Sequence, residues 1–125
     1  MEVEITDVRV AIDYQCDRAI ESPIFSVTIS TEDGDIYFDT STKAMNVVLS
    51  QIQGSGEIAL EIDRLDLNAG RYFIDVGVYE RDWAYAYDYH WHAYPFEVRS
   101  HSAAKGKLCP PCHWKLPENA DVIPE

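Results

Sequence analysis

Apolar and polar residues alternate with a period of two through most of this chain, and that pattern restricts it to a β fold. Every second side chain is apolar in residues 8–14, 25–29, 58–62, 72–78 and 94–98. A β-strand points successive side chains to opposite faces, so each of these segments predicts a strand with one buried face and one wet face. We expect six or seven short strands in an all-β, antiparallel sandwich.

Turn sequences separate the expected strands. Asp33-Gly34 and Asn68-Ala69-Gly70 favour tight turns, because glycine adopts positive φ at little cost. A strand is expected to begin at Ile36, and Gly54-Ser55-Gly56 to break the chain. Residues 40–53 fit either a short helix or a packed loop.

Length and composition suit a single folded domain. The chain has 125 residues, of which 46% are hydrophobic, enough to bury a core without covalent staples. We expect a β-sandwich over residues 1–116 and a flexible tail over 117–125, where proline and polar residues accumulate. An odd number of cysteines, three, and an acidic N-terminus unlike a signal peptide favour the reducing cytosol.

The charge balance excludes several classes of partner. Ten Lys and Arg residues against 22 Asp and Glu give a net charge of −12, and the basic residues do not cluster. Nucleic acids and anionic membrane surfaces require clustered cations, so neither is an expected partner. No segment approaches the roughly 20 apolar residues of a membrane helix, which argues against direct membrane insertion.

Several sequence segments, taken in order, resemble one family. The segments are residues 23–42, the Gly-x-Gly and Leu65-x-Leu67-x-x-Gly70-x-Tyr72-x-x-x-Val76 run within 54–78, Tyr87-Asp88, Phe96-x-Val98, and Gly106-x-x-x-Pro110-Pro111-x-x-Trp114. Together they are similar to the C-terminal domain of Wzt-type proteins, the nucleotide-binding subunits of O-antigen ABC exporters. The resemblance covers roughly residues 7–115.

This resemblance implies an immunoglobulin-like β-sandwich that binds the exported O-polysaccharide near its non-reducing end. It also implies a homodimer, and partners in the ABC transporter's nucleotide-binding domain and membrane subunit. The implied location is cytoplasmic, at the inner face of the inner membrane. The chain lacks the P-loop motif of the family's ATPase domain, and it lacks Gly-x-Ser-x-Gly and His-Glu-x-x-His motifs, so we expect neither an enzyme nor a cofactor.

An aromatic run supplies the first candidate site. Every odd position from 83 to 91 is aromatic, and flat rings stack on the C–H faces of sugars while polar neighbours bind their hydroxyls. The alternative is that these rings pack at the end of the sandwich. The predicted carbohydrate-binding residues of this run are Trp83, Asp88, His90, Trp91 and His92.

The outward face of the expected sheets supplies the second candidate site. Tyr37, Phe73, Asp75 and Tyr79 should point away from the core if their neighbours point inward. Gly77 should leave a shallow depression beside Tyr79. The alternatives are a dimer contact, or cover by residues 83–92. On these alternatives the chain is an immunoglobulin-like protein-interaction or dimerisation domain without a sugar site.

Cys109-Pro110-Pro111-Cys112 has the spacing of half a zinc site. A complete site needs two further ligands, and no second Cys-x-x-Cys pair exists. We therefore interpret the segment as structural and expect no metal. Cys16 is expected to act as a small apolar side chain of a strand.

Overall fold

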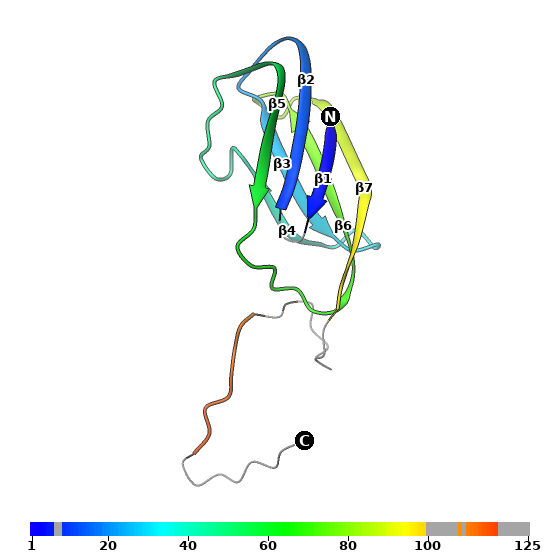
Figure 1. Cartoon of the computed structure of the whole chain (residues 1–125), viewed down its shortest axis with the longest axis vertical. Helices are drawn as coiled ribbons and strands as arrows, with labels where there is room; N and C mark the ends of the chain where they lie inside the picture. Colours follow the sequence, from blue (N-terminus) through cyan, green and yellow to red (C-terminus); the bar gives the residue numbers. More distant parts are fainter. Residues whose placement is uncertain (7–8, 100–107, 109, 118–125) are drawn as a thin grey trace.

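A computed structural model describes residues 1–6, 9–99, 108 and 110–117. Within this described part, seven strands form two antiparallel sheets packed face to face (Figure 1). One sheet has the order β1-β2-β5 and the other the order β4-β3-β6-β7. The strands are β1 (Glu2–Thr6), β2 (Arg9–Glu21), β3 (Ile24–Ser30), β4 (Ile36–Ser41), β5 (Gln51–Glu61), β6 (Gly70–Tyr79) and β7 (Ala86–Val98). The expected all-β sandwich is confirmed.

The core lies between the two sheets and follows the alternation. On β6, Tyr72, Ile74, Val76 and Val78 are all buried, and the residues between them face outward. They pack against apolar side chains of β2, β3 and β5, of which the most buried are Val10, Ile12, Phe25, Val27, Ile29 and Ile52. Burial of a side chain of this size contributes about 1.5–3 kcal/mol, so this cluster supplies most of the drive to fold.

Tyr72 ties the start of β6 to the turn before it. Its side chain is fully buried, and its hydroxyl donates a hydrogen bond to the carbonyl oxygen of Asn68 at 2.8 Å. Its ring stacks on Phe96 and meets Tyr37 edge-on, with centroids 5.6 and 6.2 Å apart. This is the arrangement of the tyrosine corner of immunoglobulin-like domains.

Two segments differ from the sequence-based expectation. Gly54-Ser55-Gly56 was expected to break the chain, but it lies inside β5 and pairs with β2. A Cβ at residue 56 would overlap the Tyr14 hydroxyl, so glycine makes room here for an inward-facing ring. Residues 42–50 form turns and an irregular loop. No helix in the described residues is long and hydrophobic enough to span a membrane.

The outer face of the three-stranded sheet carries a row of like charges. Glu2, Asp13 and Glu57 stand directly opposite one another on β1, β2 and β5. Desolvation, followed by the neighbouring carboxylate of Glu57, raises the pKa of Asp13. Like charges opposite one another destabilise a sheet, and Arg9, whose guanidinium lies 2.9 Å from the Glu57 carboxylate, offsets part of the repulsion.

Replacing Tyr72 by Phe tests the corner. The variant keeps the ring and loses the bond to the Asn68 carbonyl, so we expect its free energy of unfolding to fall by about 1–3 kcal/mol. Chemical denaturation measures the change. Tyr37→Phe is the matched control, because it alters a half-buried ring of the same cluster; an equal loss in both variants would contradict the assigned role of the Tyr72 hydroxyl.

Replacing Asp13 by Asn tests the acidic row. A carboxyl whose pKa is raised by folding destabilises the folded state once it ionises, so its penalty is present at neutral pH and disappears as the pH falls below the pKa of the unfolded chain, about 3.9. Asp13→Asn should therefore raise Tm at pH 7, with a gain that shrinks towards pH 3. Asp63→Asn, at an exposed position after β5, is the control; a gain of the same size and pH dependence there would contradict the role assigned to the acidic row.

Candidate functional site

The outer surface of the β4-β3-β6-β7 sheet has a polar floor of small residues. The alternation of β3 directs Ser26, Thr28 and Ser30 outward. Thr28 lies directly between Asp39 on β4 and Asp75 on β6, which makes one polar row across three strands. Its hydroxyl donates to the Asp39 carboxylate at 2.9 Å. The exposed Asp39 carboxylate offers hydrogen-bond acceptors at this surface.

Three rings stand at one side of this row. Tyr79 contacts both Trp83 and Tyr89, with centroids 5.1 and 6.1 Å apart. Gly77, which pairs with Tyr89, lies beneath the Tyr79 ring, because a Cβ there would approach that ring to 2.5 Å. The expected depression at Gly77 is therefore filled: the missing side chain lets Tyr79 lie flat on the sheet.

A β-bulge in β7 shapes the other side of the row. Three residues, Trp91 to Ala93, oppose the single residue Asp75, and His92 adopts a φ of 51°. The backbone N–H of His92 donates to the Asp75 carboxylate at 2.5 Å, and this charged acceptor replaces the interrupted ladder bond. Asp75, only 6% exposed, thus holds the strand in a conformation that a non-glycine residue rarely adopts.

The bulge brings a second aromatic group onto the sheet. The His92 ring lies edge-on to Phe73 with centroids 4.8 Å apart, and its Nε2 is 3.1 Å from the Ser30 hydroxyl. Trp91 lies beside it, 65% exposed, with the two ring centroids 3.9 Å apart. Arg71 stacks on Phe73, 5.4 Å from its centroid, as a cation–π contact.

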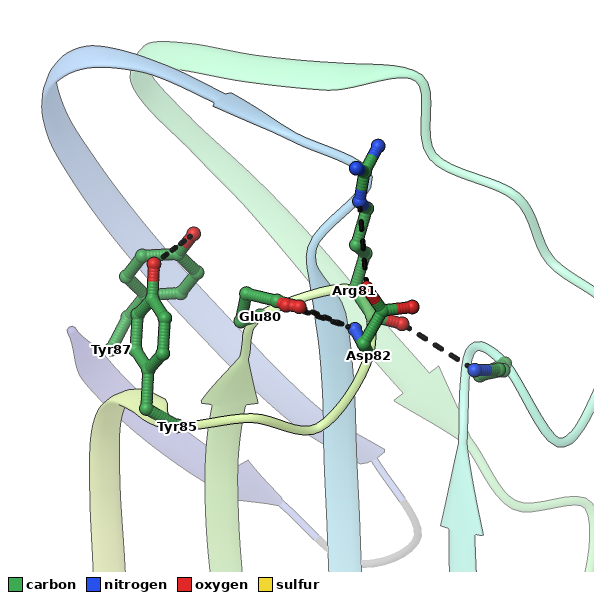
Figure 2. A network of polar contacts seen from close by, with 6 residues as sticks. Glu80, Arg81, Asp82, Tyr85 and Tyr87 are labelled. Carbon is green, nitrogen blue, oxygen red and sulfur yellow. Dashed lines mark hydrogen bonds and ion pairs between the residues drawn. The ribbon is translucent and has the colours of Figure 1, made fainter.

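The loop between β6 and β7 holds Trp83 in place. The Glu80 carboxylate accepts from the Asp82 backbone N–H at 2.7 Å (Figure 2), and the Glu80 carbonyl accepts from the Trp83 N–H at 2.9 Å. Lys43 donates to the Arg81 carbonyl at 3.4 Å, which links this loop to the one after β4. Trp83 itself has a φ of 61°. The backbone that carries Trp83 is therefore held by hydrogen bonds, and the ring itself lies against Tyr79.

We call this surface the aromatic face. Its residues are Thr28, Asp39, Phe73, Asp75, Tyr79, Trp83, Tyr89, Trp91 and His92. Its carboxylates and rings affect one another: burial, followed by the charge of Asp75, raises the pKa of both Tyr79 and Tyr89. The two hydroxyls therefore remain protonated at neutral pH and can both donate and accept hydrogen bonds.

The aromatic face unites six of the nine residues predicted from the sequence as carbohydrate-binding: Phe73, Asp75, Tyr79, Trp83, Trp91 and His92. The other three lie elsewhere. Tyr37 was expected to point outward, but it packs against the core because the register of β4 shifts beside Ile29 and Ser30. Asp88 and His90 lie on β7 with their side chains on the side of the strand opposite to Tyr89 and Trp91. There His90 Nδ1 is 2.5 Å from the Tyr94 hydroxyl.

Sequence reasoning missed three residues of the face. Tyr89 belongs to the odd-numbered aromatic run and could have been selected with Trp91. Thr28 is the middle residue of an outward Ser-x-Thr-x-Ser pattern, which gives a polar strand face but no specific sign of a site. Asp39 carried no signal, because its place beside Thr28 depends on the strand pairing.

Two other features are poorer candidates for a site. A hollow of about 260 Å³ opens between β4 and β5, but its lining is mainly apolar and includes Phe25, Met45 and Leu60. Cys112 is exposed, whereas Cys109 lies outside the described residues, so the metal-like motif is only partly described. Within the described ranges, no group of three or more metal-ligating side chains occurs. Cys16 packs against the core, as expected.

Replacing Glu80 by Ala tests the loop. Loss of the carboxylate that accepts from the Asp82 N–H should free the loop and expose Trp83, so acrylamide should quench its fluorescence more strongly. The measurement uses a Trp91→Phe/Trp114→Phe background to isolate Trp83. Asp82→Asn is the control, since among the described residues the exposed Asp82 side chain pairs with Arg81 alone, at 3.8 Å. Unchanged quenching in Glu80→Ala would show that the loop does not depend on the Glu80 contact.

Comparison with known proteins places this fold in a family. Comparison with curated protein sequences finds no significant match. Among solved structures, the crystal structure of the C-terminal domain of Wzt matches with a TM-score of 0.68 and 16% sequence identity, covering 86% of this chain and 68% of that one. The sequence model described as the Wzt C-terminal domain matches residues 3–108. The chain therefore belongs to the Wzt C-terminal domain family, which is associated with O-antigen export by ABC transporters.

Proposed function

We propose that the aromatic face binds a segment of O-polysaccharide near its non-reducing terminus and so couples the glycan to export by an ABC transporter. The observation that carries this proposal is the polar row Asp39–Thr28–Asp75 between two groups of rings. Rings stack on the C–H faces of a sugar, and carboxylates accept hydrogen bonds from its hydroxyls. Strand pairing and the bulge hold these groups in place before any ligand arrives.

The charge within the face favours a glycan over a protein partner. The centres of protein interfaces are depleted of charged residues, because a carboxylate buried without a donor loses its hydration. Asp39 is exposed in the middle of the face, where an apolar protein surface would desolvate its carboxylate. Sugar hydroxyls can replace the lost water, so a polysaccharide can cover the same surface at lower cost.

The family sets the wider context of the proposal. The binding domain would span residues 1–116, with 117–125 as a tail whose last eight residues lie outside the described part of the chain. It would work as a homodimer in the cytoplasm, at the inner face of the inner membrane. Its partners would be the transporter's nucleotide-binding domain and membrane subunit, and it would need neither catalysis nor a cofactor.

A titration with purified O-polysaccharides tests the proposal, beginning with that of the source organism. We expect saturable changes in NMR spectra with a Kd of about 1 μM to 1 mM. Trp91→Ala removes an exposed ring of the face and should weaken binding by about 1–2 kcal/mol, or roughly five- to thirtyfold. Trp114→Ala is the matched control: this indole is 91% exposed on the segment that follows the sandwich, and its loss should leave Kd unchanged.

The alternative is an immunoglobulin-like interaction or dimerisation domain without a sugar site. It predicts no response to any polysaccharide, together with a concentration-dependent mass in light scattering that falls in Trp91→Ala. That pair of results would replace the glycan proposal.

A further inference from the structure

We propose that the aromatic face selects glycans by charge: it accepts neutral and amino-bearing segments and rejects segments that carry carboxylate, phosphate or sulfate groups. This inference rests on the proposed function of the same face and adds the class of polysaccharide that it takes. It follows from where the negative charges stand, how they are held, and which cations are missing beside them.

The two carboxylates flank the place where a sugar would lie. Asp39 and Asp75 pair with Thr28 from opposite sides, so their backbones are two strand spacings, or about 10 Å, apart. A sugar ring over Thr28 would have the exposed carboxylate of Asp39 on one side and the buried carboxylate of Asp75 on the other. Hydroxyl and ammonium groups can donate hydrogen bonds to Asp39, whereas an acidic substituent is repelled by both carboxylates.

Neither carboxylate can readily move away. Asp75 is 94% buried and holds the His92 backbone N–H, and rotating it away would open the bulge. Asp39 accepts the Thr28 hydroxyl at 2.9 Å. An anionic ligand would therefore meet fixed charges, and the partial burial of the site would strengthen the repulsion.

No lysine or arginine is among the described residues that make up the face. Arg71 stacks on Phe73, four residues along β6 from Asp75. The chain as a whole carries −12, so the long-range field also disfavours the approach of an anionic polymer.

The rings add to the same preference. Electron-rich faces of Tyr and Trp attract cations within about 6 Å of the ring centroid. Tyr79, Trp83 and Tyr89 cluster beside Asp75, so a sugar ammonium on these rings would also be attracted by the charge of the buried Asp75 carboxylate. The raised pKa of Tyr79, to which burial and then Asp75 and Asp39 contribute, shows the opposite effect on a negative charge at this place.

Matched polysaccharide pairs test the inference. Uronic-acid-containing O-polysaccharides are compared with the same polymers after chemical reduction of their carboxyl groups, which preserves linkage and length. N-acetylated polymers are likewise compared with their N-deacetylated forms. Affinity is measured by calorimetry at low and high salt. Wherever at least one polymer of a pair binds, we expect the reduced or deacetylated form to bind at least about tenfold more tightly at low salt. The difference in affinity should shrink at high salt.

Two conservative variants assign the effect to its residues. Asp39→Asn and Asp75→Asn keep a carbonyl oxygen that can accept from Thr28 or His92, so the face retains its shape. Each variant should bind the acidic polymers more tightly than the unaltered protein does. This narrows the difference in affinity between the two polymers of a pair. Asp63→Asn, away from the face, is the control. It should change neither the affinity for the acidic polymers nor the difference in affinity within a pair. Unaltered discrimination in both face variants would overturn the assignment.

The outcomes separate this inference from the function on which it rests. Acidic and reduced polymers that bind equally well, with affinity still lost in Trp91→Ala, would overturn charge selection and leave glycan binding intact. No binding by any neutral, amino-bearing or acidic polymer would overturn the proposed function and this inference with it.

Discussion

The corner at Tyr72, whose ring is fully buried and whose hydroxyl donates to the Asn68 carbonyl, fixes the register on which the aromatic face depends. It sets how β6 leaves the preceding turn, and thus which of its side chains face the core. With Tyr72 inside, Phe73, Asp75 and Tyr79 must lie outside. A slip of one residue would turn Asp75 into the apolar core and Val76 onto the outer surface, so the register that places Tyr72 at the corner also places the aromatic face.

Which side chains of β6 face the core could be predicted from the sequence, because apolar residues alternate regularly with the others along this strand. Prediction was wrong where a single contact overrides the pattern. Gly56 looked like a breaker, yet it is a strand residue that accommodates the Tyr14 ring. Tyr37 turns inward because β4 changes register beside Ile29, and pairing across strands leaves no local signal in either segment.

The aromatic face was predictable in its residue types and only partly in its arrangement. An alternating aromatic run indicates that rings will be displayed, and the outward residues of β6 were identified correctly. Their convergence depends on the bulge at His92, which in turn depends on the buried carboxylate of Asp75. One side chain therefore does two jobs: it shapes the strand, and it contributes charge to the surface that the strand displays.

The irregularity of β7 also bears on how copies of this domain can meet. β7 is an edge strand, and edge strands recruit other strands through their unpaired backbone groups. Here the register shifts twice along the strand, and Pro95 has no N–H to donate. A second β-strand would find no continuous ladder to extend. The border of the sheet beside Trp91 and Tyr89 is thus protected against β-augmentation, and remains open to a ligand that does not bind through backbone hydrogen bonds.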